Sequence, residues 1–437
     1  MKARLPLVAA LVVALFPVKA SAQAWVGRPD FSEGVGIRAG NLEFHPSLGA
    51  EFGYDSNYFR SSKEEGVIDV FRLRVTPSLT LSTLGKERRN AATPPAFNFS
   101  SSLYGTYHEV FPAGSEAIGG AARRNLGVGA DAKLDVFPQS KIGFDLLASY
   151  LRVVQTDGST EDLAGDGFDR GTVRGGGGVT WRPGGGLFEW RVGYQGTYNY
   201  FDNSQFSSLT NIHHDIGSRG RWRFLPRSAL LFDTDYTFVR YTRDTPQTDG
   251  DIVRARVGFH GLVTYHLALM GLVGWSTSFY EAHQGSIAPR QFDAVVGQAE
   301  ARWFLMSRPD LDSSTITSGL SSVAVGYGRT FSNSYFGSYY QRDRGYLNFS
   351  MFLVGAVAAG IDFGVSRVAF PEVTAPTPHD SFSQLRLDGR VFAEYRITET
   401  LAANATVQYD QVNSPVVNDE HLDYNRWQAY VGLRLFW

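Results

Sequence analysis

The sequence predicts an all-β protein, namely a transmembrane antiparallel up-and-down β-barrel of about 18 strands. Three observations predict this fold. Apolar and polar residues alternate along most of the chain after residue 42, the last stretch ends on a tryptophan, and the N-terminus has the features of a secretory leader. A strand with one apolar and one polar face suits a wall between lipid and an aqueous lumen. We therefore expect an integral protein of the outer membrane of a Gram-negative bacterium.

The N-terminus has the pattern of a removable signal. Lys2 and Arg4 precede an apolar run over 5–16, and the small residues of 20–22 form a cleavage motif. The run is shorter than the roughly 20 apolar residues that a spanning helix needs. We expect 1–22 to be a signal peptide, 23–41 a short periplasmic N-terminal extension, and 42–437 the outer-membrane barrel.

Composition excludes several classes of function. The chain has no cysteine and a formal net charge of −2, so neither disulfides nor a lipidated cysteine can form, and no basic stretch favours nucleic acid. The histidines are scattered over strands and loops, and no Ser/His/Asp set or metal-ligand spacing emerges. We therefore expect no catalytic residues, no metal and no cofactor.

The first two predicted strands show the alternation clearly. In 42–54, the apolar and polar faces are Leu42, Phe44, Leu48, Ala50, Phe52 and Tyr54 against Glu43, His45, Ser47 and Glu51. In 71–82, they are Phe71, Leu73, Val75, Leu79 and Leu81 against Arg72, Arg74, Thr76, Ser78, Thr80 and Ser82. This two-residue period is typical of half-apolar β-strands.

The same pattern recurs along the rest of the chain. Further strands begin near Phe97, Leu126, Ile142, Val173, Phe188, Ile216, Leu230, Val253, Leu267, Ala294, Val323, Tyr340, Ala359, Leu385, Leu401 and Trp427. With the first two they make about 18, an even number as in bacterial single-chain barrels. Tight turns such as 182–186 and 264–266 alternate with longer loops such as 154–169 and 371–381. We assign the tight turns and both termini to the periplasm and the longer loops to the cell exterior, with 305–319 as an unusually long periplasmic connection.

The C-terminal strand, 424–437, carries the expected membrane-insertion signal. Its lipid-facing set is Trp427, Val431, Leu433, Leu435 and Trp437, with Ala429 between them. We expect this strand to contact outer-membrane lipid and the outer-membrane insertion machinery. Aromatic residues suit the headgroup level, and the predicted periplasmic strand ends carry Trp181, Trp222, Phe224, Trp303 and Trp437.

Rows of arginine occupy the predicted lumen face. The candidate pore-lining residues are Arg72, Arg74, Arg219, Arg221, Arg223, Arg254, Arg256, Arg386, Arg390 and Arg434, together with Tyr430. Such rows favour anions in a pore. Acids also point inward on this pattern, including Asp131, Asp135, Asp145, Asp233, Asp235, Glu300, Asp362, Asp388 and Glu394. Two interpretations stay open: a dedicated anion path, or structural ladders in which these charges neutralise one another.

Short motifs in 44–48 (FHPSL), 54–57 (YDSN) and 340–342 (YQR) resemble the family of outer-membrane barrels called β-barrel porin 2 (BBP2). The chain is also similar to polysaccharide-export porins of Gram-negative bacteria of the myxobacterial type. This resemblance implies secretion of an exopolysaccharide, the transported substrate, with a separate periplasmic polysaccharide export protein or copolymerase as partner. The candidate contacts for that partner are 24–41 and 308–314. The alternatives are a passive diffusion porin for small solutes, with anionic solutes favoured, and a structural or adhesive barrel.

Overall fold

The computed structural model describes residues 36–64, 66–84, 96–114, 123–153, 170–202, 204–243, 247–281, 290–305, 321–334, 338–353, 356–373, 378–417 and 421–437. The expected signal peptide, 1–22, lies outside the described residues. So do 23–35 of the expected extension and 308–314 in the long periplasmic connection. The assignment of these segments stays a prediction.

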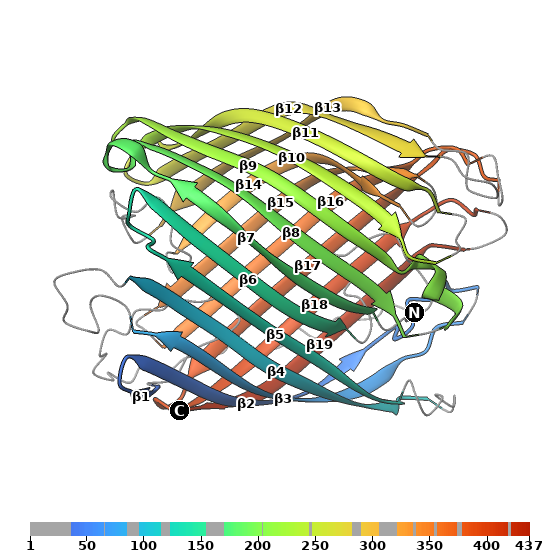
Figure 1. The fold of residues 1–437 in the computed structure, drawn as a ribbon. Helices are drawn as coiled ribbons and strands as arrows, with labels where there is room; N and C mark the ends of the chain where they lie inside the picture. Colours follow the sequence, from blue (N-terminus) through green and yellow to red (C-terminus); the bar gives the residue numbers. More distant parts are fainter. Residues whose placement is uncertain are drawn as a thin grey trace.

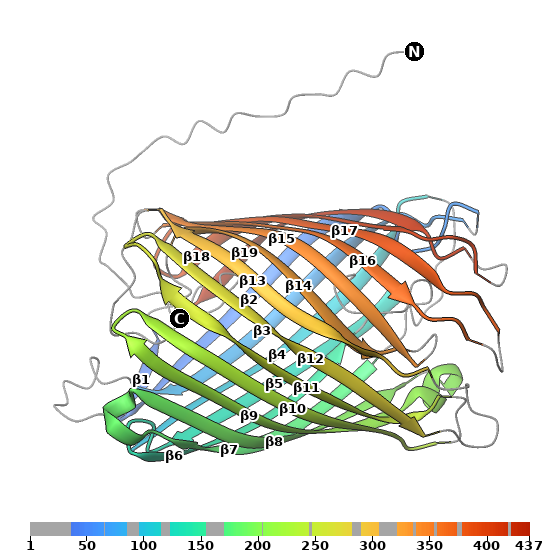
Figure 2. The ribbon, with the colours of Figure 1, turned by 90° about the horizontal axis from the view of Figure 1, so that it is seen from above.

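The chain forms a closed antiparallel barrel of eighteen strands, in which each strand pairs with its neighbours in sequence and β19 pairs with β2 (Figures 1 and 2). A short further strand, β1 (Ile37–Ala39), pairs with the start of β2. The barrel strands are β2 (Leu42–Asp55), β3 (Val70–Thr83), β4 (Phe97–Pro112), β5 (Arg124–Val136), β6 (Ile142–Val153), β7 (Arg170–Trp181), β8 (Phe188–Phe201), β9 (Asn211–Leu225), β10 (Ser228–Tyr241), β11 (Asp249–Leu262), β12 (Leu267–Glu281), β13 (Asp293–Phe304), β14 (Ser322–Asn333), β15 (Tyr339–Leu353), β16 (Val357–Phe370), β17 (Phe382–Arg396), β18 (Leu401–Asn413) and β19 (Tyr424–Phe436). Two 3₁₀ turns, η1 (Pro183–Gly186) and η2 (Ser204–Leu209), lie in connections.

The predicted fold is confirmed, and each predicted strand starts within a few residues of an observed one. The short strand β1, in the segment expected to be an extension, was not predicted. The last contact of the C-terminus with β2 is the hydrogen bond from the Trp437 backbone N–H to the Pro46 carbonyl. The edge of β2 before this point, at 42–44, is therefore available to pair with β1. Among the described residues, no helix has the length and apolar character needed to cross a membrane.

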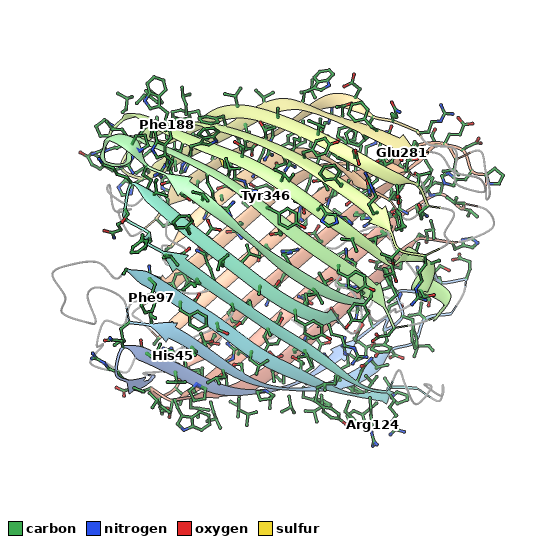
Figure 3. The ribbon with its side chains drawn as sticks, viewed as in Figure 1. His45, Phe97, Arg124, Phe188, Glu281 and Tyr346 are labelled. Carbon is green, nitrogen blue, oxygen red and sulfur yellow. The ribbon has the colours of Figure 1, made fainter. Side chains whose placement is uncertain are left out.

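The outer face of the barrel is apolar, as the alternation predicts. Phe52 is 48% exposed and Val431 is 64% exposed, whereas the inward Glu43 is 7% exposed. So large an exposed apolar surface indicates lipid contact. The side chains that project from the wall can be followed in Figure 3, where Phe97 and Phe188 lie at one end of the barrel and Arg124 and Glu281 at the other.

Aromatic side chains form a ring near each end of this apolar surface. At the end with the C-terminus, the predicted set is exposed: Trp181, Trp222, Phe224, Trp303 and Trp437. At the opposite end, the exposed aromatic side chains include Tyr107, Trp275, Tyr327 and Trp427. A belt of aromatic residues at each headgroup level is typical of outer-membrane barrels.

The two ends differ in their connections. The end with β1 and the C-terminus has tight connections, such as 226–227 between β9 and β10 and 397–400 between β17 and β18. The opposite end has longer ones, such as 56–69 and 371–381. Besides the long connection expected between β13 and β14, the connection 84–96 between β3 and β4 is also long, which the sequence pattern did not indicate. We refer to the end with the longer loops as the outer mouth.

Candidate functional site

The register of the sheet decides which side chains face the lumen. Residues directly opposite each other on antiparallel strands lie on the same face. Following the partners around the barrel, the inner face receives the predicted set: Arg72, Arg74, Arg219, Arg221, Arg223, Arg254, Arg256, Arg386, Arg390, Tyr430 and Arg434. The lumen therefore brings these side chains into one enclosure, although they do not form one cluster.

The larger lumen cavity has a volume of about 560 Å³ and is lined mainly by β7 to β12. Arg254 and Arg256 of β11 line it from one wall. The Arg254 guanidinium donates to Asp235 at 2.6 and 3.2 Å, and Arg256 donates to Asp233 at 2.6 and 2.9 Å. Two-point pairing of this kind fixes the orientation of a guanidinium and compensates its charge.

Arg170 and Arg174 of β7 line the same cavity and were not among the predicted residues. No hydrogen bond or ion pair joins either guanidinium to a carboxylate within the described residues. His213, which lines the cavity on β9, is close enough for both arginines to act on it electrostatically. The pattern could have revealed both arginines, because they share one face of 170–181.

The smaller lumen cavity has a volume of about 370 Å³ and lies against β2 to β4 and β17 to β19. Its wall contains Arg74, which pairs with Glu51 at 3.0 Å and whose Cζ lies 3.6 Å from the centre of the Tyr430 ring. Tyr430 is 2% exposed, and its ring covers Gly53, where an added Cβ would lie 2.3 Å from a ring carbon. Glycine at position 53 therefore allows the tyrosine to lie flat on the wall and support Arg74.

The remaining predicted arginines have varied surroundings. Arg434 donates to Glu394 at 3.1 Å, and Arg390 lines the smaller cavity. Arg221 lies 3.5 Å from Glu189, whereas Arg219, 4.0 Å from Asp235, is largely exposed to the lumen. Outside the two cavities, Arg386 donates to Gln384 at 2.8 Å, and Arg223 also lies outside them. For most of these arginines the neutralised-ladder interpretation fits, since a carboxylate of an adjacent strand, or for Arg434 of the next strand but one, lies within ion-pair distance.

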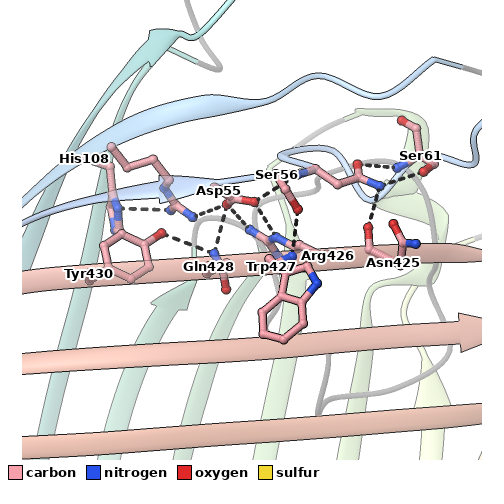
Figure 4. Close-up of polar contacts among 11 residues, drawn as sticks. Asp55, Ser56, Ser61, His108, Asn425, Arg426, Trp427, Gln428 and Tyr430 are labelled. Atoms are coloured by element: carbon pink, nitrogen blue, oxygen red, sulfur yellow. Dashed lines mark hydrogen bonds and ion pairs between the residues drawn. The ribbon is translucent and has the colours of Figure 1, made fainter. Parts of the chain in front are cut away.

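A buried charge cluster at the outer mouth was missed by the sequence reasoning. The carboxylate of Asp55 at the end of β2 is fully buried and accepts from Arg426 at 2.5 and 2.8 Å and from Arg72 at 3.1 Å (Figure 4). Gln428 donates to the same carboxylate at 2.9 Å and to the hydroxyl of Tyr430 at 3.2 Å. This cluster ties the first barrel strand to the last at the closing seam.

Beside this cluster, the start of the first outer loop is fastened to β19. Ser56 donates its backbone N–H to the Trp427 carbonyl at 2.9 Å, and its hydroxyl accepts from the Trp427 N–H at 2.7 Å. Asn57 donates through Nδ2 to the carbonyl of Asn425 at 3.2 Å. Figure 4 shows these contacts as a continuous row along β19.

One group of possible metal ligands lies at the outer rim, within the described residues. The ligand atoms of Glu64, His421 and Asp423 lie within 4.8 Å of one another. His421 Nδ1 is 3.9 Å from a carboxylate oxygen of each acid, and all three side chains are at least one-third exposed. The group belongs to the loops and has no part in the two lumen cavities.

Comparison with protein-family models finds no match, and no curated protein matches the sequence. The resemblance to BBP2 therefore gains no support from sequence comparison. Among solved structures, Pseudomonas aeruginosa OpdK with vanillate is 11% identical with a TM-score of 0.47, covering 91% of this chain and 99% of that one. P. aeruginosa OccK9 (OpdG) is 13% identical with a TM-score of 0.45, covering 90% and 98%. The FrpB iron transporter of Neisseria meningitidis is 9% identical with a TM-score of 0.45, covering 85% and 62%.

The location of the protein follows from the barrel itself. Every strand of the wall is paired on both sides, which satisfies the backbone polar groups that lipid cannot. The outer face is apolar between two aromatic rings, and the inner face is polar. The chain is thus an integral outer-membrane protein of a Gram-negative bacterium, built as a closed barrel of eighteen antiparallel strands.

Proposed function

We propose that the protein is a passive diffusion channel for small solutes that favours anions. The excess of arginine over carboxylate in the walls of both lumen cavities supports this proposal. In the described residues, the inner-face arginines that line the larger cavity are Arg170, Arg174, Arg254 and Arg256, and its only two acids are Asp215 and Asp235. The inner-face arginines that line the smaller cavity are Arg72, Arg74, Arg390, Arg426 and Arg434, and its only acid among the described residues is Glu51.

The paired arginines mainly shape the wall, so the cations that attract solutes are those without a carboxylate. Arg170 and Arg174 meet this description in the larger cavity, as described above. An arginine row that is not neutralised raises the local concentration of anions and lowers the barrier to their passage.

We expect the double variant Arg170→Ala/Arg174→Ala to lower the chloride-to-potassium permeability ratio about fivefold, equivalent to about 1 kcal/mol for charges acting across a water-filled lumen. The measurement is the reversal potential in a planar bilayer under a potassium chloride gradient. The matched control is Arg124→Ala, because Arg124 is 68% exposed at the outer end, where it pairs with Glu109 on the outer face. A cation-selective wild type, or an unchanged ratio in the double variant, would overturn the proposal.

Secretion of an exopolysaccharide, the function implied by the family resemblance, gains no support from the comparisons. The lumen favours the small-solute alternative, because cavities of about 370 and 560 Å³ are in the range of small-molecule sites. We expect a clean deletion strain to keep its surface polysaccharide and to take up small anions more slowly. Loss of one polymer with unchanged outer-membrane permeability would instead favour a secretion conduit, and with it a periplasmic export partner.

A further inference from the structure

We propose that the loop 56–64 is the selectivity element of the outer mouth, with its shape held by Asn57 and its charge supplied by Arg60. This inference rests on the proposed channel function and adds to it a specific filter. The loop follows β2 and precedes the exposed tip at 66–67. In the sequence, Ser56 and Asn57 stand out only as part of the 54–57 motif (YDSN), and 58–64 has no assigned role.

Asn57 gives the loop a fixed shape. The residue is 1% exposed, and its Nδ2 donates to the Ser61 carbonyl at 2.8 Å as well as to the Asn425 carbonyl. Its Oδ1 accepts from the Ser61 backbone N–H at 3.0 Å. One amide therefore closes the loop on itself and also fastens it to β19, so the loop is held to the barrel wall.

The loop lies inside the barrel mouth. Tyr58 is 3% exposed and packs with Val70 and Val110, which are 0% and 1% exposed. The register places both valines on the inner face, because Val70 pairs with Asp55 and Val110 pairs with Arg72. A loop that pointed away from the mouth would leave these inward valines facing water. The loop must therefore occupy part of the opening.

Arg60 stands at the turn of this loop in an unfavourable backbone conformation. Its φ is +60°, which non-glycine residues rarely adopt, and it is 8% exposed. Its backbone N–H donates to the Asn57 carbonyl at 3.3 Å. Glycine would fit this conformation without strain. Arginine at such a position therefore points to a role for the side chain.

The loop also adjoins the path into the smaller cavity. The Arg72 Cζ lies 5.3 Å from the centre of the Tyr58 ring, and Arg72 itself lines that cavity. A solute that enters from outside on this side passes the loop before it meets Arg72 and Arg74. The loop can therefore limit both the size and the charge of what reaches the cavity.

Two variants separate shape from charge in planar bilayers. We expect Asn57→Ala/Tyr58→Ala, which releases the loop, to raise single-channel conductance and the size of polyethylene glycol that enters the pore. We expect Arg60→Gly, which suits the observed φ, to lower the anion-to-cation permeability ratio while the size limit stays unchanged. The matched control is Lys63→Ala, because Lys63 is an exposed cation of the same loop.

The outcomes distinguish this inference from the proposed function. A wild type that forms no pores, or cation-selective ones, overturns the channel proposal. An anion-selective wild type whose conductance, size limit and ion preference are unchanged in both variants overturns the filter. Because the chain has no cysteine, Arg60→Cys gives a second test that does not depend on releasing the loop. An anionic thiol reagent should reduce its anion current and a cationic one should restore it, whereas equal currents with both reagents would contradict the inference.

Discussion

Replacing Asp55 by alanine is expected to remove about 3–5 kcal/mol of folding free energy, because it leaves two buried arginines without their shared carboxylate. Arg426 is 2% exposed and Arg72 is 6% exposed. The loss falls at the seam between β2 and β19, where the barrel closes, so assembly should suffer along with stability.

The measurement is urea unfolding of the barrel in lipid vesicles, followed by tryptophan fluorescence. The matched control is Asp202→Ala, which removes a carboxylate 2.7 Å from Arg152 where both side chains are about one-third exposed. Ion pairs this accessible contribute about 1 kcal/mol or less. If Asp55→Ala and Asp202→Ala lowered the free energy of unfolding equally, burial at the seam would add nothing to the stabilisation by the Asp55 ion pairs.

The strands and their faces could be predicted from the sequence because a strand that separates lipid from water has a strict period of two. Val431 and Leu433 had to share a face, and the structure leaves both exposed on the outside. The same reasoning placed the arginine rows inward. Periodicity is a local property, so each strand carries its own signal whatever its neighbours do.

The partners of the inward charges could not be predicted in the same way. Arg254 faces Asp235 and Arg256 faces Asp233 because β10 and β11 pair in one register out of several. That register depends on the turn between the strands and on packing around the whole barrel, and the alternation fixes only its parity. For this reason the sequence left both the neutralised ladders and the anion path open, with the ladders favoured.

The position of the loop 56–64 inside the barrel mouth could not be predicted from the sequence for a related reason. Its contacts join Asn57 to Asn425 and Tyr58 to Val110, across long separations in sequence. The residues of 56–64 show no regular alternation of apolar and polar side chains. The positive φ of Arg60 is equally invisible in the sequence, because glycine or asparagine would ordinarily mark such a position.

Adjacent residues of β18 offer the sharpest test of which face meets lipid. Val407 lies in the middle of the strand, is 41% exposed, and pairs with Val391 and Ala429, whereas Gln408 lines the smaller cavity. We expect Val407→Arg to cost about 2–4 kcal/mol of folding free energy, since an arginine near the middle of the apolar band must enter hydrocarbon.

Gln408→Arg is the matched control, because it places the same side chain one position away in water. We expect it to leave the unfolding midpoint in urea almost unchanged and to raise the chloride-to-potassium permeability ratio, as it adds a cation opposite Arg390 in the lumen. The pair of variants thus links the fold to the function, since one substitution tests the lipid face by stability and the other tests the lumen by ion preference. If Val407→Arg unfolded like the wild type while Gln408→Arg unfolded early, the two faces would have to be exchanged, and the lumen assignment of every arginine row would fall with them.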